Sequence, residues 1–395
     1  MDDPRELARR IFDAGLRAAD PFAAVENALD RVQSPALIIA VGKAARRMAE
    51  PALARFQGAP CLVVTNYENA GDLNGALVLA AGHPVPDENG AAAGRTVIDA
   101  LQAAQGPVLA LISGGGSALL PAPAGDVTLA DKAVVNELLL GAGMDIRTMN
   151  LIRQQLSQLK GGGFLRCAAP HQVTALILSD VVGDDLSAIA SGPTAHPIGT
   201  AAEAIEALQK AGIWARVPDA VRTYLKGAPP PEPVPDCTNV LVGSNARSVA
   251  AMAKEAGKAH VMSDPVEGDV ADAARKICDE AQPGITVWGG ETTVHLRGNG
   301  RGGRNQELAL RIALEARARG WTRWVCLQGG SDGRDGPTDA AGGLVDQDTL
   351  DKIGAVEALL ANNDSYAALK QAGDLLITGA TGTNVADLGV MIRMD

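Results

Sequence analysis

The chain has 395 residues, a length typical of two domains that can each bury a core. It carries 46 acidic against 35 basic residues, a formal net charge of −11, and only 3% of its residues are aromatic. Excess negative charge repels a phosphate backbone, and few rings are available to stack on bases, so no nucleic-acid partner is expected.

The cysteines and the N-terminal segment indicate where the protein works. Five widely spaced cysteines without a CxxC pair argue against a disulfide framework or a zinc site and fit a reducing compartment. The first 20 residues are charged and amphipathic, which predicts a helix rather than a signal peptide. No apolar run approaches the roughly 18 residues that span a bilayer. We expect a cytoplasmic protein with no membrane partner, and the sequence leaves open whether it forms a homo-oligomer.

Short apolar runs alternate with helical patterns in the N-terminal half. The helix predicted at 145–163 has Asp145 as N-cap and three glycines as its stop, and another helix is predicted at 88–104. This βαβ pattern predicts a larger, Rossmann-like domain whose mostly parallel sheet is covered on both faces. Buried strands are predicted at 36–42, 61–66, 76–82, 107–115 and 173–182.

A proline-rich stretch, APPPEPVP at 228–235, cannot continue a helix or a central strand and suits a stiff linker. We therefore predict an N-terminal domain at 1–232 and a second, smaller α/β domain at 236–395. Strands of the second domain are predicted at 239–244, 259–264, 285–291, 324–333 and 374–379.

Glycines and charged residues cluster just after the carboxyl ends of these strands, where open α/β sheets bind ligands. The clusters lie at 40–43, 113–117, 179–185, 289–291 and 329–336. Glycine lets main-chain N–H groups approach an anion. We therefore predict a nest for phosphate or carboxylate at Ser113, Gly114, Gly115, Gly116 and Ser117. The alternative for this segment is a tight turn without a ligand.

Three segments near these strand ends bear on familiar sequence signatures. The segment 37–44 lacks the spacing of a P-loop. Gly298, Gly300 and Gly303 match GxGxxG and raise a dehydrogenase hypothesis, but Arg301 and Arg304 in that loop suit a multiply charged phosphate better. The GxSxG match around Ser331 has no following helix and no downstream histidine, which excludes the hydrolase triad.

Five motifs in order resemble the glycerate 2-kinases of the MOFRL family, some members of which have been labelled hydroxypyruvate reductase. They are LISGGGSALLPAP, TMNLIRQQLSQLKGGG, LILSDVVGDDLSAIASGPT, GGETTVHLRGNGRGGRNQELAL and GGSDGRDGPTDAAGG. The resemblance covers nearly the whole chain. It implies phosphorylation of D-glycerate to 2-phosphoglycerate with ATP and Mg²⁺ as cofactors. It places the functional lysine and arginine of the family on Lys43 and Arg304.

The chemistry of phosphoryl transfer agrees with these residues. Positive charge around the transferred phosphoryl group would come from Lys43, Arg301 and Arg304. Lys43 is expected in the first turn of the helix after strand 36–42, where the helix dipole disfavours a cation unless an anion is bound nearby. Mg²⁺ takes oxygen ligands, for which the strand-end loops offer four aspartates. Asp180 and Asp332 are preferred over Asp184 and Asp335, and a cap or turn role is the alternative for each.

The remaining assignments concern the substrate and the alternatives. Glu291 is expected to bind phosphate or to orient an arginine. The carboxyl group of glycerate is assigned to the nest at 113–117 or to Arg153, for which the alternative is a solvated helix face shared with Lys160. Two other functions stay open. An NAD(P)H-dependent hydroxypyruvate reductase would oxidise NADH or NADPH, and a binding or scaffold protein would show no turnover with ATP and glycerate.

Overall fold

The computed structural model describes residues 3–230 and 232–395. Contacts divide them into two compact units, each described here by itself. The parallel-sheet unit comprises Pro21–Leu178 and Asp184–Val242. The mixed-sheet unit comprises Gly243–Asp395, Ser179–Gly183 and the described part of Met1–Asp20.

The parallel-sheet unit is built on a six-stranded sheet. Its strands are β1 (Leu37–Val41), β2 (Cys61–Asn66), β3 (Leu77–Ala81), β4 (Val108–Ser113), β5 (Val173–Leu178) and β6 (Cys237–Gly243). Their order is β3-β2-β1-β4-β5-β6, and the pairs from β3 to β5 are parallel. This is the Rossmann strand order. The Rossmann-like fold and the first five predicted strands are therefore confirmed.

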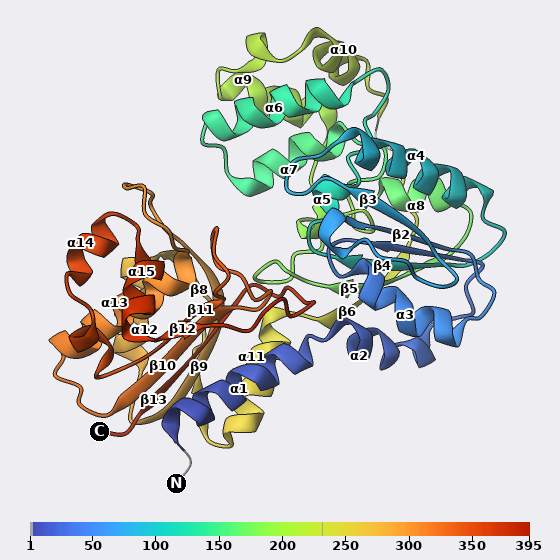
Figure 1. Ribbon diagram of the computed structural model, residues 1–395. Helices are drawn as coiled ribbons and strands as arrows, with labels where there is room; N and C mark the ends of the chain where they lie inside the picture. Colours follow the sequence, from blue (N-terminus) through green and yellow to red (C-terminus); the bar gives the residue numbers. More distant parts are fainter. Residues whose placement is uncertain (1–2, 231) are drawn as a thin grey trace. The chain divides into compact units, whose positions relative to one another are not determined.

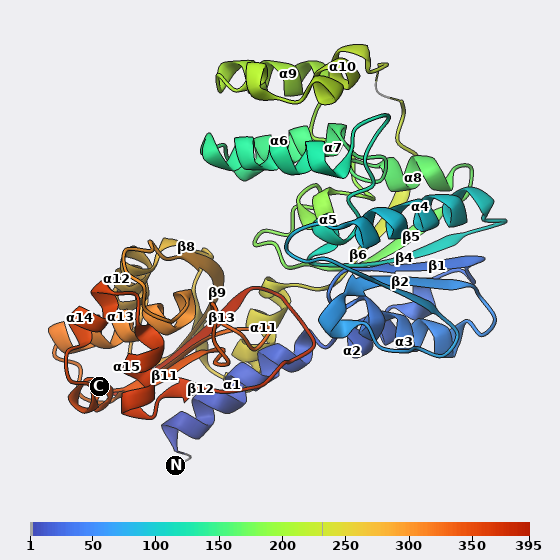
Figure 2. The same cartoon turned by 45° about the horizontal axis from the view of Figure 1, so that its top comes forward.

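Helices cover both faces of this sheet, as an all-parallel sheet requires. Figures 1 and 2 show α2 (Pro21–Glu26) and α3 (Ala45–Arg55) on one face and α4 (Glu88–Ala103) and α8 (Gly163–Ala168) on the other. The helix predicted at 88–104 is thus confirmed as α4, and Asp87 caps its N-terminus by accepting from the Gly90 N–H. Shorter turns of helix are α5 (Gly116–Leu119), η1 (Leu29–Arg31), η2 (Tyr67–Asn69), η3 (Ile189–Ser191) and η4 (Trp214–Arg216).

A separate helical layer belongs to the same unit (Figure 2). Its helices are α6 (Leu129–Gly141), α7 (Ile146–Gln155), α9 (Ala201–Lys210) and α10 (Asp219–Gly227), which bury a core of their own. Asp145 caps α7 as predicted. The helix ends at Gln155 instead of continuing to the glycines at 161–163, because Ser157 forms a bridge with Pro123 and the Gln158 N–H donates to the Ala122 carbonyl.

The mixed-sheet unit contains seven strands. They are β7 (Ala259–Val261), β8 (Val266–Asp269), β9 (Gly284–Thr293), β10 (Trp324–Gly330), β11 (Gly342–Asp346), β12 (Leu375–Leu376) and β13 (Asp387–Arg393). The order is β12-β11-β10-β13-β9-β7, with β8 also paired to β9. Strand β13 lies between β10 and β9 and is antiparallel to both. Strands β8, β11 and β13 are missing from the sequence-based prediction.

Helices also cover both faces of this second sheet (Figure 1). On one face lie α1 (Pro4–Ala18) and α11 (Asn245–Ala256), where Gly15 leaves room for Met252. The other face is covered by α12 (Val270–Glu280) and α13 (Arg304–Ala318), together with η5 (Thr349–Lys352), α14 (Val356–Ala361) and α15 (Ser365–Ala372). The second α/β fold is thus confirmed.

The two compact units differ from the two domains that the sequence predicts, 1–232 and 236–395. Helix α1 belongs to the mixed-sheet unit, whereas the proline-rich stretch leads from α10 into β6 within the parallel-sheet unit. The domains 1–232 and 236–395 stay a prediction. Across the described residues, no helix has the length and apolarity needed to cross a membrane.

Candidate active site

The carboxyl ends of β1 and β4 form the switch point of the parallel sheet, because the chain continues from β1 to β2 on one side while β4 lies on the other. Two loops leave these strands and are hydrogen-bonded together. The Lys43 N–H donates to the Gly114 carbonyl at 2.9 Å, and the Ala44 N–H donates to Ser113 Oγ at 3.1 Å. Gly42 has φ +123°, and a Cβ there would lie 2.2 Å from Ser113 Oγ. Only glycine fits this junction.

Lys43 stands in this junction with its backbone fixed on both sides. Its carbonyl accepts from Asn69 Nδ2 at 3.0 Å. The expectation that Lys43 lies in the first helical turn is wrong, since α3 begins at Ala45 after the N-cap Ala44. The side chain extends along Gly115 and His83: a Cβ on Gly115 would lie 3.1 Å from both Lys43 Cγ and His83 Cδ2. Burial and then the charge of Lys43 lower the pKa of His83.

The predicted nest at 113–117 has two parts. Ser113 is 1% exposed, and its hydroxyl bonds to the backbone at Val41 and Ala44, so it fixes the loop. Gly115, at φ +85°, and Ser117 instead line a pocket. Ser117 Oγ lies 2.8 Å from Ser191 Oγ.

The turn that carries Ser191 is conformationally strained. Ala190 and Ser191 both have positive φ, 50° and 61°. A Cβ on Gly116 would lie 2.8 Å from the Ala190 side chain, so glycine allows the two loops to approach. Strained non-glycine residues persist where the surroundings hold them, often at functional sites.

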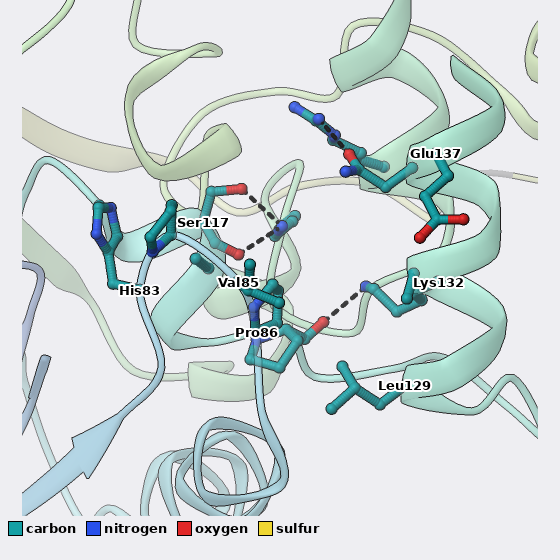
Figure 3. A pocket seen from close by; sticks show the side chains of 15 residues that line it. His83, Val85, Pro86, Ser117, Leu129, Lys132 and Glu137 are labelled. Atoms are coloured by element: carbon teal, nitrogen blue, oxygen red, sulfur yellow. Dashed lines mark hydrogen bonds between the residues drawn. The ribbon is translucent and has the colours of Figure 1, made fainter. Parts of the chain in front are cut away.

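The pocket next to this junction has a volume of about 500 Å³ and belongs wholly to the parallel-sheet unit (Figure 3). One wall comes from segments 83–86 and 115–121, and the other from α6 and α7. Apolar side chains such as Val85 and Leu129 alternate in the lining with the cations Lys132, Arg153 and Lys160.

Lys160 is 5% exposed and lies beyond the end of α7, so it is no part of a solvated helix face. Its Nζ donates to Ser117 O at 2.9 Å and to Ser117 Oγ at 2.8 Å. Burial, reinforced by the charge of Arg153, lowers the pKa of Lys160 to about 7. Burial also lowers the pKa of Arg153, whose Nη2 donates to Asn136 Oδ1.

A second group of charges surrounds Arg304 in the mixed-sheet unit. Arg304 opens α13, and its Nε donates to Asp387 Oδ2 at 2.6 Å and its Nη2 to Asp387 Oδ1 at 3.1 Å. Glu291 Oε1 lies 3.2 Å from Arg304 Nη2. These acids raise the pKa of Arg304 against the effect of its burial.

The predicted metal-binding aspartates take part in this group to different degrees. Asp180 contributes to the raised pKa of Glu291, and Asp332 to the raised pKa of Asp387, both after the larger effect of burial. Asp335 is 4% exposed and accepts the N–H groups of Asn305 and Gln306, which gives it the role of a cap on α13.

The GxGxxG glycines are packed against the protein's own chain. A Cβ on Gly298 or Gly300 would lie 2.4 to 2.5 Å from the Asn362 carbonyl oxygen, and one on Gly303 would lie 2.3 Å from Asp335. Arg301 donates from Nε to the Pro337 carbonyl at 2.9 Å and lies over the Tyr366 ring. This loop therefore has a structural reason for its glycines that needs no dinucleotide.

Comparisons with known proteins cover both units. Residues 284–387 match the MOFRL family, and residues 7–226 match a domain family of unknown function, DUF4147. The D-glycerate 2-kinase of Thermotoga maritima is 38% identical, with 98% of this chain and 99% of that protein covered. This chain belongs to the glycerate 2-kinase family. The crystal structure of a T. maritima glycerate kinase superposes with a TM-score of 0.90 at 37% identity, covering 98% of this chain and 99% of that one.

The glycerate 2-kinase family also includes proteins with another name. A protein of Agrobacterium vitis, 39% identical over 98% of this chain and 94% of its own length, is provisionally named a hydroxypyruvate reductase. The resemblance to glycerate 2-kinases with a reductase label is therefore confirmed.

Four functional candidates of this glycerate 2-kinase fold are absent from the sequence-based set. Asp387 begins a strand that was not predicted, and Lys160 seemed to belong to the solvated continuation of a helix. His83 precedes a proline, and neither it nor Lys132 stands in a recognisable motif. Only the last turn of a helix pattern, followed by three glycines, could have indicated that Lys160 leaves the helix.

Proposed function

We propose that this protein transfers the γ-phosphoryl group of ATP to the 2-hydroxyl of D-glycerate, giving 2-phosphoglycerate and ADP. The observation that carries the proposal is Lys43 at the switch point of a Rossmann-ordered sheet in a member of the glycerate 2-kinase family. Nucleotide phosphates bind in such crevices, where glycine loops and helix N-termini supply N–H groups.

Lys43 acts by its charge. In phosphoryl transfer the substrate oxygen forms the new P–O bond while the bond to ADP breaks, and negative charge spreads over the equatorial oxygens. Lys43 stabilises this charge from a backbone that Gly114 and Asn69 hold in place. Gly114 to Gly116 shape the loop, and Ser117 faces the pocket.

Arg304 is the second cation of the mechanism. Asp387 and Glu291 hold its guanidinium in one orientation, so it is ready to bind an anionic oxygen without reorganisation. Arg301, which is exposed, is assigned to the nucleotide phosphates as a screening charge. The proton of the 2-hydroxyl passes to solvent or to a nearby base.

Mg²⁺ is proposed to arrive with ATP and to bind Asp180 and Asp332. Among the described residues, no three His, Cys, Asp or Glu side chains are arranged to hold a metal. Mg²⁺ needs only one or two carboxylates besides the phosphates and its waters. After burial, Asp180 raises the pKa of Glu291 and Asp332 raises the pKa of Asp387, and this concentration of negative charge fits such a cation. When bound, Mg²⁺ neutralises charge on the β- and γ-phosphates.

Release of ADP that depends on D-glycerate tests the proposal. A coupled assay should show turnover with ATP, Mg²⁺ and D-glycerate. Little turnover is expected with glycerol, which lacks the carboxylate, or with excess EDTA. A folded preparation that releases no ADP above the glycerate-free blank would contradict the kinase function and leave a binding protein.

The reductase stays a second candidate because of the name of the A. vitis relative. It requires hydride transfer from NADH or NADPH to hydroxypyruvate. The same preparation should leave both cofactors unoxidised in the presence of hydroxypyruvate. Steady oxidation at a rate above that of the kinase reaction would favour the reductase.

A further inference from the structure

The pocket of the parallel-sheet unit contains positive charge that its own lining does not neutralise. Burial and mutual repulsion lower the pKa of Lys132 well below its usual range, with Lys160 and Arg153 as the repelling charges. Within the described residues the lining includes one acidic side chain, Glu137, and that residue is exposed (Figure 3). Burying like charges without a partner costs free energy, and a bound anion would return it.

The three cations are used differently by the protein. Lys132 Nζ donates to the Pro121 carbonyl at 2.7 Å and to the Leu156 carbonyl at 2.8 Å, so it joins α6 to two loops. Lys160 fixes Ser117. Within the described residues, Arg153 makes one hydrogen bond, from Nη2 to Asn136. A guanidinium has five N–H donors. Arg153 therefore has the largest capacity left for a ligand.

We propose that this pocket binds the acid substrate and that Arg153 and Lys160 hold its carboxylate. The inference rests on the proposed kinase function and adds to it the residues that bind the carboxylate of its 2-hydroxy acid. A guanidinium matches the two oxygens of a carboxylate, and an ammonium adds a point charge. Ser117 and Gly115 connect this pocket to the Lys43 junction, because both line the pocket and Gly115 contacts the Lys43 side chain.

The pocket favours a small acid over the polyphosphate of ATP. Its walls at Val85, Pro86 and Leu129 are apolar. The glycine loop also reaches the Lys43 junction, where Gly115 contacts the Lys43 side chain, and glycine loops of this kind bind nucleotide phosphates. The short acid is thus assigned to Arg153 and the nucleotide to Lys43.

Calorimetric titration of D-glycerate into the full chain, with a non-hydrolysable ATP analogue present, tests this assignment. Arg153→Met should weaken D-glycerate binding by about 100-fold, and Arg153→Lys should restore part of it, because a buried charge pair is lost and then partly replaced. Affinity for the ATP analogue should change less than about 3-fold. Arg147→Met is the matched control, since Arg147 is an exposed arginine of the same helix outside the pocket, and it should bind like the wild type.

Asn136→Ala separates ligand binding from a purely structural role. It removes the partner of Arg153 but keeps the guanidinium, so its effect on D-glycerate binding should be much smaller than that of Arg153→Met. Equal losses in both variants would mean that Arg153 only ties α6 to α7, and would overturn the inference.

Proton uptake gives a second readout. The charged groups that face Lys160 are Arg153 and Lys132, with Glu137, His83 and Lys43 at the pocket or its edge. A carboxylate raises the proton affinity of Lys160. Binding at pH 8 should therefore take up protons, seen as a binding enthalpy that varies with the ionisation enthalpy of the buffer, and Lys160→Met should reduce this dependence.

The outcomes distinguish this inference from the kinase function. Unchanged glycerate affinity and KM in a folded, active Arg153→Met protein would overturn the pocket assignment and leave the kinase intact. A wild-type protein that binds D-glycerate through Arg153 but never phosphorylates it would support the pocket and contradict the kinase. Loss of binding for the ATP analogue instead of D-glycerate would assign the pocket to the nucleotide and overturn the inference.

Discussion

Arg304 and Asp387 form a two-bond ion pair, with 2.6 Å from Nε to Oδ2 and 3.1 Å from Nη2 to Oδ1. Asp387 begins β13 and pairs with Gly330 at the end of β10 and with Gly290 of β9, and Arg304 opens α13. The pair therefore joins the central strand of the mixed sheet to the helix that covers it. Asn305 Nδ2 also donates to Asp387 Oδ1, at 2.9 Å.

Asp387→Asn should destabilise the fold and misorient Arg304. The Asp387 side chain is 4% exposed, whereas Arg304 is one-third exposed and keeps Glu291 as a partner. The solvent and the remaining partner reduce the loss, so we expect about 1 to 3 kcal/mol in the free energy of unfolding. Urea denaturation of the variant measures it, with Arg317→Gln, which removes an exposed pair to Asp351, as the control. Equal stabilities of wild type and Asp387→Asn would show that the pair has no structural role.

Lys43→Ala should lower kcat by roughly 100-fold or more while the protein stays folded. Loss of one electrostatic contact to the transition state typically costs about 3 kcal/mol. The loop should survive because Lys43 is held through its backbone N–H and carbonyl, which alanine keeps. Lys43→Arg should not fully restore the rate, since a planar fork does not replace a compact ammonium. Steady-state kinetics with circular dichroism as the folding control decide it, and near wild-type kcat in folded Lys43→Ala would remove this residue from the mechanism.

We expect titration of Asp335 to lower the free energy of unfolding as the pH rises from about 4 to 6. Burial raises the pKa of Asp335 from 3.8 to about 6, against the backbone N–H groups of Gln306 and Asn305. In this window the folded protein holds a proton that the unfolded chain has lost, so raising the pH favours unfolding. The contribution is full below pH 3.8 and is lost as the pH passes 6, with a slope of up to about 1.4 kcal/mol per pH unit.

Denaturation of wild type and Asp335→Asn at several pH values isolates this contribution, because other titrating groups are common to both. The stability of the wild type relative to Asp335→Asn should decrease as pH rises through the window. A difference that stays constant from pH 4 to 7 would mean that Asp335 titrates normally.

The parallel sheet was predictable because its buried strands are continuous apolar runs between clear turn residues, as at 108–113. Strand β13 lacks that pattern: it begins with Asp387 and contains Gly389, which is there because a Cβ would lie 2.1 Å from the Trp288 ring. When a neighbouring strand requires a glycine, the sequence of one segment does not show that requirement. Because β13 was not predicted, the role of Asp387 at its start was not predicted either.

Site residues that directly follow a predicted strand could be predicted from the sequence. Site residues that are placed by tertiary packing could not. Lys43 and the 113–117 loop follow predicted strands directly, so their meeting at the switch point follows from the strand order. Lys160 enters the pocket because the chain turns at Ser157 to pair with Pro123. That contact joins two distant segments, so local helix propensity could not reveal it.

The identity of the phosphorylated product tests the central claim most directly. The protein should be incubated with ATP, Mg²⁺ and D-glycerate, and the product identified by ³¹P and ¹H NMR. The account predicts 2-phosphoglycerate in an amount equal to the ADP formed, and roughly a hundredth of that amount or less when Lys43→Ala replaces the wild type over the same time. Formation of 3-phosphoglycerate alone, or of ADP without any phosphorylated glycerate, would contradict it.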